Sequence, residues 1–310
     1  MRLLLVLSLV FALTMFFGCS ESTKEEINEF EALADYLENT DPNYEGWVNT
    51  MTGWVVDYAN IQSNLGDYLI VDIRPAADFA MPLTGAINTP LANIFDVVDG
   101  HTGKILVVCY TGQTSAFAHM LLRMKGYEAY SLKWGMSIVD ASLDRWTNNC
   151  SNAFWGASNW ITGASPALPT FDYPELNTGK DNGPDILDAR ITAALGVWGT
   201  RMITASTVMA NPANYNIINY WSQAHWDAMG HINGAVRVQP QTLKRAQNLS
   251  VFDPSTGDNV FYCYTGQTSA AAVAYLYVLG YDVKTIAYGT NAMIHDNLIA
   301  NKWPKPWSAK

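Results

Sequence analysis

The same eight residues, CYTGQTSA, occur twice in the sequence, and this duplication restricts the possible folds more than any other feature. The copies begin at Cys109 and Cys263, which are 154 residues apart. A downstream Gly-Tyr pair, which begins at Gly126 and again at Gly280, keeps the same spacing. A period this long indicates a duplicated domain, because solenoid repeats are only about 20–50 residues long. The chain of 310 residues is long enough to give each copy a core of its own.

Both copies contain the same order of predicted elements. The apolar, β-branched runs YLIVDI and KILVVC in the first copy, and NVFYC in the second, predict buried strands. After each cysteine, a segment with apolar residues at helical spacing ends at Gly126 or Gly280, and a further strand follows. The sequence therefore predicts an α/β fold with two tandem domains, each a central, mostly parallel β-sheet flanked by helices.

The predicted domains span residues 41–150 and 184–310. Residues 151–183 between them are rich in Asn, Gly, Ser and Pro and have no sustained hydrophobic period, which indicates a linker. The aromatic residues of this linker predict that it packs against a domain instead of extending into solvent.

Residues 1–18 have the composition of a secretory signal peptide, with one Arg followed by an apolar run. The Gly18–Cys19 junction resembles the lipobox of bacterial lipoproteins, in which the cysteine becomes the lipidated first residue. Lipidation of Cys19 would make residues 19–40 a tether and would anchor the protein to a membrane in the periplasm. Ser20, in place of an Asp, favours the outer membrane. The alternative is a plain cleaved signal peptide with an incidental cysteine.

The charge balance excludes one class of partner. The net charge of −10 argues against binding to nucleic acid, whose phosphates require a basic surface. No metal site is predicted, because His225 and His231 have no cysteine at ligand spacing. No cofactor is expected either.

The position of the two cysteines indicates their chemistry. Each follows a predicted strand and precedes a predicted helix, whose free N–H groups carry partial positive charge. A loop curled around the sulfur, as Gly112 and Gly266 would permit, adds further N–H groups and favours a nucleophilic thiolate. The residues expected to cap the two helices are Thr114, Ser115, Thr268 and Ser269. The alternative is an ordinary buried cysteine at the end of each strand.

Together these segments resemble the rhodanese (sulfurtransferase) family. In the first copy the resemblance rests on VDIRPAADF, LTGAINTP and LKWGMS, in the second on AHWDAMGHINGAVRV and IAYGTN, and in both on CYTGQTS. It covers most of residues 50–145 and 200–300. The resemblance implies that Cys109 and Cys263 are nucleophiles that carry sulfur as persulfides, with a thiosulfate or polysulfide donor and a thiol or cyanide acceptor. It implies a supporting role for Asp72 and Arg74, and two substrate-binding loops formed by Tyr110, Thr111, Gly112, Gln113, Thr114 and Ser115 and by Tyr264, Thr265, Gly266, Gln267, Thr268 and Ser269.

Two departures from the family pattern affect these expectations. Many rhodaneses carry Arg or Lys within the loop, whereas neither loop contains a cation here. The absence of cations from both loops favours a less charged donor, such as polysulfide, over the thiosulfate dianion. The second copy also has INYW where the first has VDIR, so the Asp72 and Arg74 pair has no counterpart there.

Three alternatives remain to be weighed. A cysteine phosphatase requires Arg six residues after its cysteine, where this chain has Ser115 and Ser269. A thiol–disulfide oxidoreductase requires a second cysteine nearby, and Cys150 could serve only if the fold returns it to the loop. A non-catalytic module that carries sulfur or binds a partner is compatible with the acidic chain and the uncharged loops.

Overall fold

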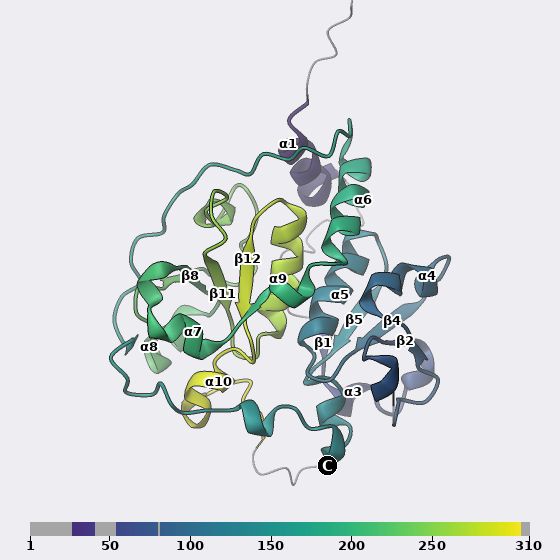
Figure 1. The fold of residues 1–310 in the computed structure, drawn as a ribbon, viewed down its shortest axis with the longest axis horizontal. Helices are drawn as coiled ribbons and strands as arrows, with labels where there is room; N and C mark the ends of the chain where they lie inside the picture. The colour runs from purple at the N-terminus through teal and green to yellow at the C-terminus, as the bar shows by residue number, and fades with distance from the viewer. Residues whose placement is uncertain (1–26, 41–53, 80, 305–310) are drawn as a thin grey trace, which may run out of the picture.

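The computed structural model describes residues 27–40, 54–79 and 81–304, and these form two parallel β-sheets of five strands each (Figure 1). The strand order is β1-β5-β4-β2-β3 in the first sheet and β10-β8-β11-β12-β7 in the second. Neighbouring strands are parallel throughout both sheets. The predicted α/β fold, with two parallel sheets flanked by helices, is confirmed.

The strands are short, and the central strand of each sheet is the one that precedes a CYTGQTSA segment. The first sheet contains β1 (Val55–Val56), β2 (Tyr68–Asp72), β3 (Ile87–Asn88), β4 (Lys104–Val108) and β5 (Ala129–Leu132). The second contains β7 (Met202–Ile203), β8 (Asn216–Asn219), β10 (Val236–Arg237), β11 (Asn259–Tyr262) and β12 (Val283–Ile286). Covered on both faces, β4 and β11 are almost fully buried, which explains their unbroken apolar sequence.

The helices lie on both faces of the sheets. They are α1 (Glu29–Asp35), α3 (Tyr58–Ile61), α4 (Ile94–Val98), α5 (Gln113–Met124), α6 (Gly183–Ala194), α7 (Ala205–Ala210), α8 (Gln223–Met229), α9 (Gln267–Val278) and α10 (Asn291–Ile294). Within the described ranges, each helix is too short or too polar to cross a bilayer.

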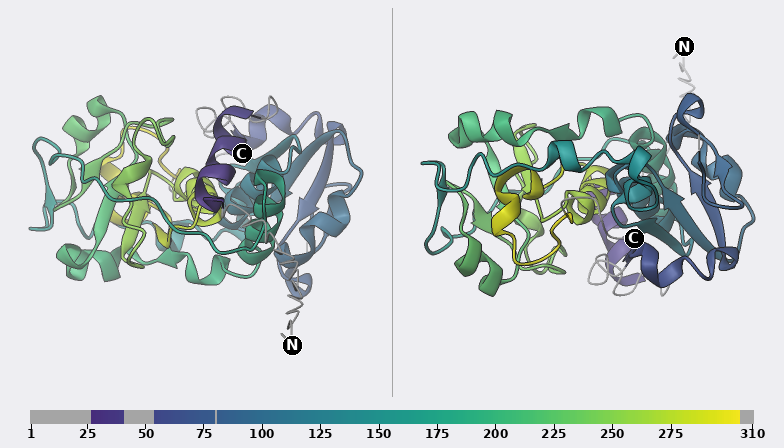
Figure 2. Two further views of the ribbon diagram at one scale, coloured as in Figure 1. Left: turned by 90° about the horizontal axis from the view of Figure 1, so that it is seen from above. Right: turned by 90° about the horizontal axis from the view of Figure 1, so that it is seen from below.

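The two domains meet where α5 packs against α9. Figure 2 shows the blue first domain and the green and yellow second domain side by side. Nearly every residue of both helices is buried, and together they contribute to one apolar core that crosses the interface. Alanines such as Ala116, Ala270 and Ala274 keep the helix surfaces narrow there. A helix that is apolar around most of its circumference must be covered on more than one side, and these two helices cover each other.

Residues 29–40 differ from the predicted tether. Here α1 buries Phe30, Leu33 and Ala34 against α6 and the core that α5 and α9 share. Sequence analysis overlooked this apolar face because acidic residues surround it. The guanidinium group of Arg245 binds three of those carboxylates, which belong to Glu31, Asp35 and Glu38. The signal peptide at 1–18, Cys19 and the remainder of the predicted tether up to residue 26 lie outside the described residues.

Residues 151–183 run along the outer side of the second domain, as the teal coil in Figure 1 shows. Strand β6 (Trp160–Ile161) pairs antiparallel with β9 (His231–Ile232), and the indole of Trp160 donates a hydrogen bond to the carbonyl of Met229 at 2.8 Å. The linker is therefore attached to the second domain by backbone pairing and by aromatic side chains. The predicted domain boundaries themselves stay a prediction.

The docking of α1 generates a stability prediction. Phe30 is 1% exposed and its ring stacks on Tyr173 with centroids 4.8 Å apart. We expect Phe30→Ala to lower the free energy of unfolding by about 3 kcal/mol, measured by urea denaturation, because it removes a buried aromatic side chain. Ile27→Ala, at an exposed position just before the helix, is the control and should change little. Equal stability of the two variants would show that α1 does not pack in solution.

Candidate active site

Cys109 lies at the carboxyl end of β4, and the loop that follows encloses its sulfur. The backbone N–H groups of Gly112 and Ser115 point at Sγ, with nitrogen–sulfur distances of 3.2 and 3.4 Å. The hydroxyl oxygen of Ser115 lies 3.5 Å from the same sulfur. The loop can curl this tightly because Gly112 has a φ of 82°, in the left-handed region that glycine tolerates.

Cys263 occupies the equivalent position after β11. The Ser269 N–H is 3.4 Å from its Sγ and the Ser269 hydroxyl oxygen is also 3.4 Å away. Gly266 repeats the left-handed backbone conformation with a φ of 73°. Both sulfurs are nearly buried, since Cys109 is 5% exposed and Cys263 is 2% exposed. Each sulfur therefore lies at the N-terminus of a 12-residue helix, whose unpaired N–H groups carry partial positive charge.

The loop serines and threonines do not cap the helices, which corrects the sequence-based expectation. The N-cap residues are Gly112 and Gly266, and neither helix has a side-chain cap. The hydroxyl of Ser115 instead bonds Ser131 at 2.8 Å, and that of Ser269 bonds Thr285 at 2.6 Å. Each serine thereby forms a pair of hydroxyl groups with its partner directly beside the cysteine sulfur of its own domain. Thr114 accepts a hydrogen bond from the Trp198 indole, and Thr268 faces the cavity described below.

The two loops are connected by a reciprocal pair of glutamines. Gln113 of the first loop accepts a hydrogen bond from the Tyr288 N–H of the second domain at 2.7 Å. Gln267 of the second loop accepts one from the Trp134 N–H at 3.4 Å and donates one to the Thr111 carbonyl at 3.2 Å. The two candidate sites therefore lie on either side of one interface. Both glutamines were predicted to belong to the loops. Their contacts with the opposite domain could not be predicted, because the sequence pattern within one domain does not show which residues of the other domain it touches.

Each loop also rests on a glycine from the segment after the next strand. A Cβ atom on Gly135 would lie 2.6 Å from the Thr111 nitrogen, and one on Gly289 would lie 2.5 Å from the Cys263 carbonyl oxygen. Both glycines have positive φ, 62° and 53°. The glycine shared by LKWGMS and IAYGTN is therefore required for two reasons. The loop approaches too closely to leave room for a side chain, and the backbone conformation has a positive φ.

Asp72 and Arg74 form a buried ion pair beside the first loop. Arg74 Nη2 lies 2.7 Å from Asp72 Oδ2, and Nε bonds both carboxylate oxygens. The guanidinium carbon of Arg74 lies 5.3 Å from the centre of the Tyr110 ring, so the pair supports the loop through that ring. In the second domain Trp221 takes the place of Arg74 and stacks on Tyr264 with centroids 5.1 Å apart.

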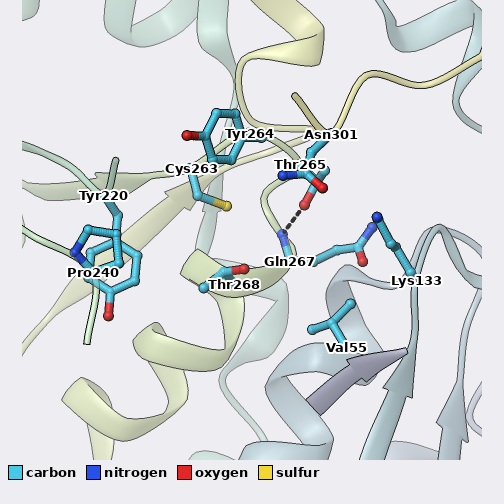
Figure 3. Close-up of a pocket in the computed structure, with 10 residues that line it drawn as sticks. All are labelled: Val55, Lys133, Tyr220, Pro240, Cys263, Tyr264, Thr265, Gln267, Thr268 and Asn301. Atoms are coloured by element: carbon cyan, nitrogen blue, oxygen red, sulfur yellow. Dashed lines mark hydrogen bonds between the residues drawn. The ribbon is translucent and has the colours of Figure 1, made fainter. Parts of the chain in front are cut away.

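Cations outside the loops approach both sites. The exposed Arg145 also lies over the Tyr110 ring, with 4.7 Å between its guanidinium carbon and the ring centre. Lys133, which follows β5 of the first domain, lines a cavity of about 200 Å³ beside Cys263 (Figure 3). The sequence-based expectation considered only the loops and therefore missed both side chains.

The remaining candidate groups lie in other surroundings. Cys150 is half-buried beside an aromatic cluster of Trp134, Trp146 and Trp303, and no disulfide joins the three cysteines of the described chain. His225 hydrogen-bonds the Tyr264 hydroxyl, whereas His231 stacks on Trp226. Within the described ranges no group of three or more His, Cys, Asp or Glu side chains is arranged to hold a metal ion.

The serine hydroxyls generate a reactivity prediction. Because a hydrogen bond to a charged group contributes about 1.5–3 kcal/mol, we expect Ser115→Ala to slow alkylation of Cys109 by iodoacetamide about tenfold at pH 7. The assay uses the Cys263→Ser background, and peptide mass spectrometry identifies the alkylated cysteine. Ser142→Ala, at an exposed position away from the loops, is the matched control. An unchanged rate in Ser115→Ala would mean that the hydroxyl does not stabilise the reactive sulfur.

Comparison with known proteins places the chain in a family. The model of the rhodanese-like domain matches residues 56–142 and residues 174–295, which together make up more than half of the chain. The second match begins within the predicted linker. Among curated proteins, none matches the chain significantly.

Solved structures with similarity to the chain include two rhodanese relatives. A rhodanese homolog from the extremely thermophilic bacterium Thermus thermophilus is 34% identical, with a TM-score of 0.23, and the match covers 26% of this chain and 94% of that chain. A rhodanese-related protein from Thermoplasma volcanium is 20% identical, with a TM-score of 0.26, and the match covers 27% of this chain and 87% of that chain. On the two domain matches, the chain belongs to the rhodanese-like family and contains the family's domain twice.

Proposed function

We propose that the protein is a sulfurtransferase that moves sulfane sulfur through persulfides on Cys109 and Cys263. One observation carries this proposal: two backbone N–H groups at Cys109 and one at Cys263 point at a cysteine sulfur that lies beside a serine hydroxyl at a helix N-terminus. An anionic sulfur, whether thiolate or persulfide, is the group that such an arrangement stabilises. The burial of both sulfurs favours small donors and acceptors, since a bulky substrate would not reach them.

The first half-reaction loads the cysteine. The thiolate attacks the outer sulfur of the donor, a new S–S bond forms, and the S–S bond within the donor breaks. The electron pair of the broken bond leaves with the remainder of the donor, which is sulfite when the donor is thiosulfate. When the donor is a polysulfide, the leaving group is the polysulfide shortened by one sulfur. The loop amides remain in contact with negative charge throughout, so no proton has to move.

The second half-reaction releases the sulfur to an acceptor. A thiolate or cyanide attacks the outer sulfur of the persulfide, and the bond to Sγ breaks with its electron pair returning to the cysteine. The products are a low-molecular-weight persulfide or thiocyanate and the free cysteine thiolate. A non-catalytic sulfur carrier, the alternative function, would complete the first half-reaction without rapid turnover of the second.

Replacement of both nucleophiles tests the proposed chemistry. We expect the Cys109→Ser, Cys263→Ser double variant to lose sulfurtransferase activity with both thiosulfate and polysulfide, because an alcohol at this position cannot accept sulfane sulfur. Peptide mass spectrometry after incubation with polysulfide should show added sulfur at Cys109 and Cys263 of the parent protein and none at these positions in the double variant. Cys150→Ser, which retains both loop cysteines, is the matched control and should retain activity.

The outcomes separate the two functions. Addition of sulfur to the parent without catalytic turnover would favour the carrier, whereas undiminished activity of the double variant would rule out the persulfide mechanism at these cysteines.

We also propose that the protein works in the periplasm, anchored to a bacterial membrane through lipid on Cys19, with the outer membrane favoured. The support is the sequence of residues 1–20, which lie outside the described structure. Cys19→Ala should move the protein expressed in a bacterium from the membrane pellet to the soluble fraction, measured by immunoblotting. Cys150→Ala is the control. Retention of the Cys19→Ala protein in the pellet would contradict the lipid anchor.

A further inference from the structure

The cavity beside Cys263 is built by both domains. The second domain contributes Cys263, Thr265, Gln267 and Thr268, and the first contributes Val55 and Lys133 across the interface (Figure 3). Its volume of about 200 Å³ suits a small molecule of a few heavy atoms. Lys133 is the only cationic side chain among the described residues that line it. The cavity therefore combines one nucleophilic sulfur, several hydroxyl and amide groups, and one positive charge.

The backbone fixes Lys133 close to the second loop. Its N–H donates to the Val56 carbonyl at 2.8 Å, which continues the pairing of β5 with β1. The N–H of the next residue, Trp134, bonds the Gln267 side chain of the second loop. Gln267 is the first residue of α9, so this bond holds Lys133 near the helix N-terminus that faces Cys263.

The ammonium group of Lys133 is available to a bound anion. Its only ion pair in the described structure is with Asp57, at an Nζ–Oδ1 distance of 3.2 Å. The Asp57 side chain is 49% exposed, and an ion pair in contact with solvent contributes little. An anion inside the cavity can therefore compete with Asp57 for the ammonium group.

The first site has no counterpart to this lysine. The bond from Tyr288 to Gln113 mirrors the bond from Trp134 to Gln267, so Ala287 takes the position that Lys133 has at the second site. The arginines near the first loop, Arg74 and Arg145, belong to the first domain itself and lie over the Tyr110 ring. The cationic side chain near Cys263 thus comes from the other domain, whereas the cationic side chains near Cys109 come from the same domain as the cysteine.

The geometry points to Lys133 as the residue that makes the Cys263 site accept a dianionic sulfane-sulfur donor of thiosulfate size. This inference rests on the proposed sulfurtransferase function and assigns a substrate class to one of its two sites. Lys133 binds the sulfonate end of the donor, while the outer sulfur faces Cys263. The thiolate takes the outer sulfur, the S–S bond of the donor breaks, and sulfite leaves with the bonding electron pair and both of its negative charges.

A comparison of two donors in the Cys109→Ser background tests this role. Thiosulfate carries two negative charges, whereas methanethiosulfonate transfers the same outer sulfur but carries one and leaves as methanesulfinate. We expect Lys133→Gln to lower kcat/KM for thiosulfate about tenfold, mainly through KM, because one charge–charge interaction is lost. The loss with methanethiosulfonate should be clearly smaller, Lys133→Arg should restore most of the thiosulfate activity, and higher salt should weaken the lysine-dependent advantage.

Two further variants complete the experiment. Lys104→Gln is the matched control, because Lys104 is exposed at the start of β4, the end of the strand opposite to the loop, and does not line the cavity beside Cys263. Asp57→Asn, which frees the Lys133 ammonium, should raise kcat/KM for thiosulfate severalfold. This variant decides the question if Lys133→Gln does not fold, since an unchanged or lower value would then overturn the inference.

The failure of the inference is distinguishable from that of the proposed function. If the Cys109→Ser protein forms a persulfide on Cys263 and Lys133→Gln affects both donors equally, the lysine does not select the donor, and the sulfurtransferase function stands. If mass spectrometry detects no persulfide on Cys263 with either donor, the proposed chemistry fails at this site and the inference fails with it.

Discussion

The arrangement of the whole molecule depends on the packing of α5 against α9. These are the helices that follow the two cysteine loops, so their contact brings the N-termini of both helices, and both loops, to the same interface. Gln113 and Gln267 then connect each loop to the opposite domain. The glycine at the start of each helix makes room for the partner glutamine: a Cβ on Gly112 would lie 2.9 Å from the Gln267 side chain, and one on Gly266 would lie 2.6 Å from that of Gln113. Each loop is thus shaped by the other, and a lone domain would lack the hydrogen bonds that the glutamines make across the interface.

The proposed function requires a buried sulfur to remain reactive, and this mutual support would allow it. Burial of an uncompensated negative charge is costly, because the charge loses its hydration. Two loop amides at Cys109, one at Cys263, and in both cases a serine hydroxyl and the end of a helix lie where they can replace the lost water. These groups stabilise the anion only while the loop keeps its curled conformation. The glycines beneath the loops and the glutamines across the interface therefore contribute to the chemistry without contacting the sulfur.

The sequence predicted the features that repeat within a domain and missed those that arise between domains. The two central strands, the cysteines at their carboxyl ends and a helix after each loop follow from local pattern, because apolar runs and glycine positions determine them. The helices begin earlier than expected, at Gln113 and Gln267. The docking of α1 was not predictable in this way, since its apolar face binds a core assembled from distant helices. The same holds for Lys133, whose distance from Cys263 in the sequence gives no sign of their shared cavity. The serines were assigned the wrong role because helix capping is the common use of such residues, whereas here glycine occupies the cap position.

The divergence of the two copies argues against the loss of either site. Asp72 and Arg74 support the Tyr110 ring of the first domain through a buried ion pair, whose desolvation cost is close to its electrostatic gain. Asn219 and Trp221 replace that pair in the second domain, and the stacked indole supports Tyr264 by apolar contact instead. The second loop therefore has a stacked indole behind Tyr264 in place of a charged pair. The replacement leaves the cavity in front of Cys263 with Lys133 as its cation. The duplication has therefore kept one loop geometry twice and has changed the charges around it, so that under the proposed function the two cysteines would carry out the same chemistry in differently charged surroundings.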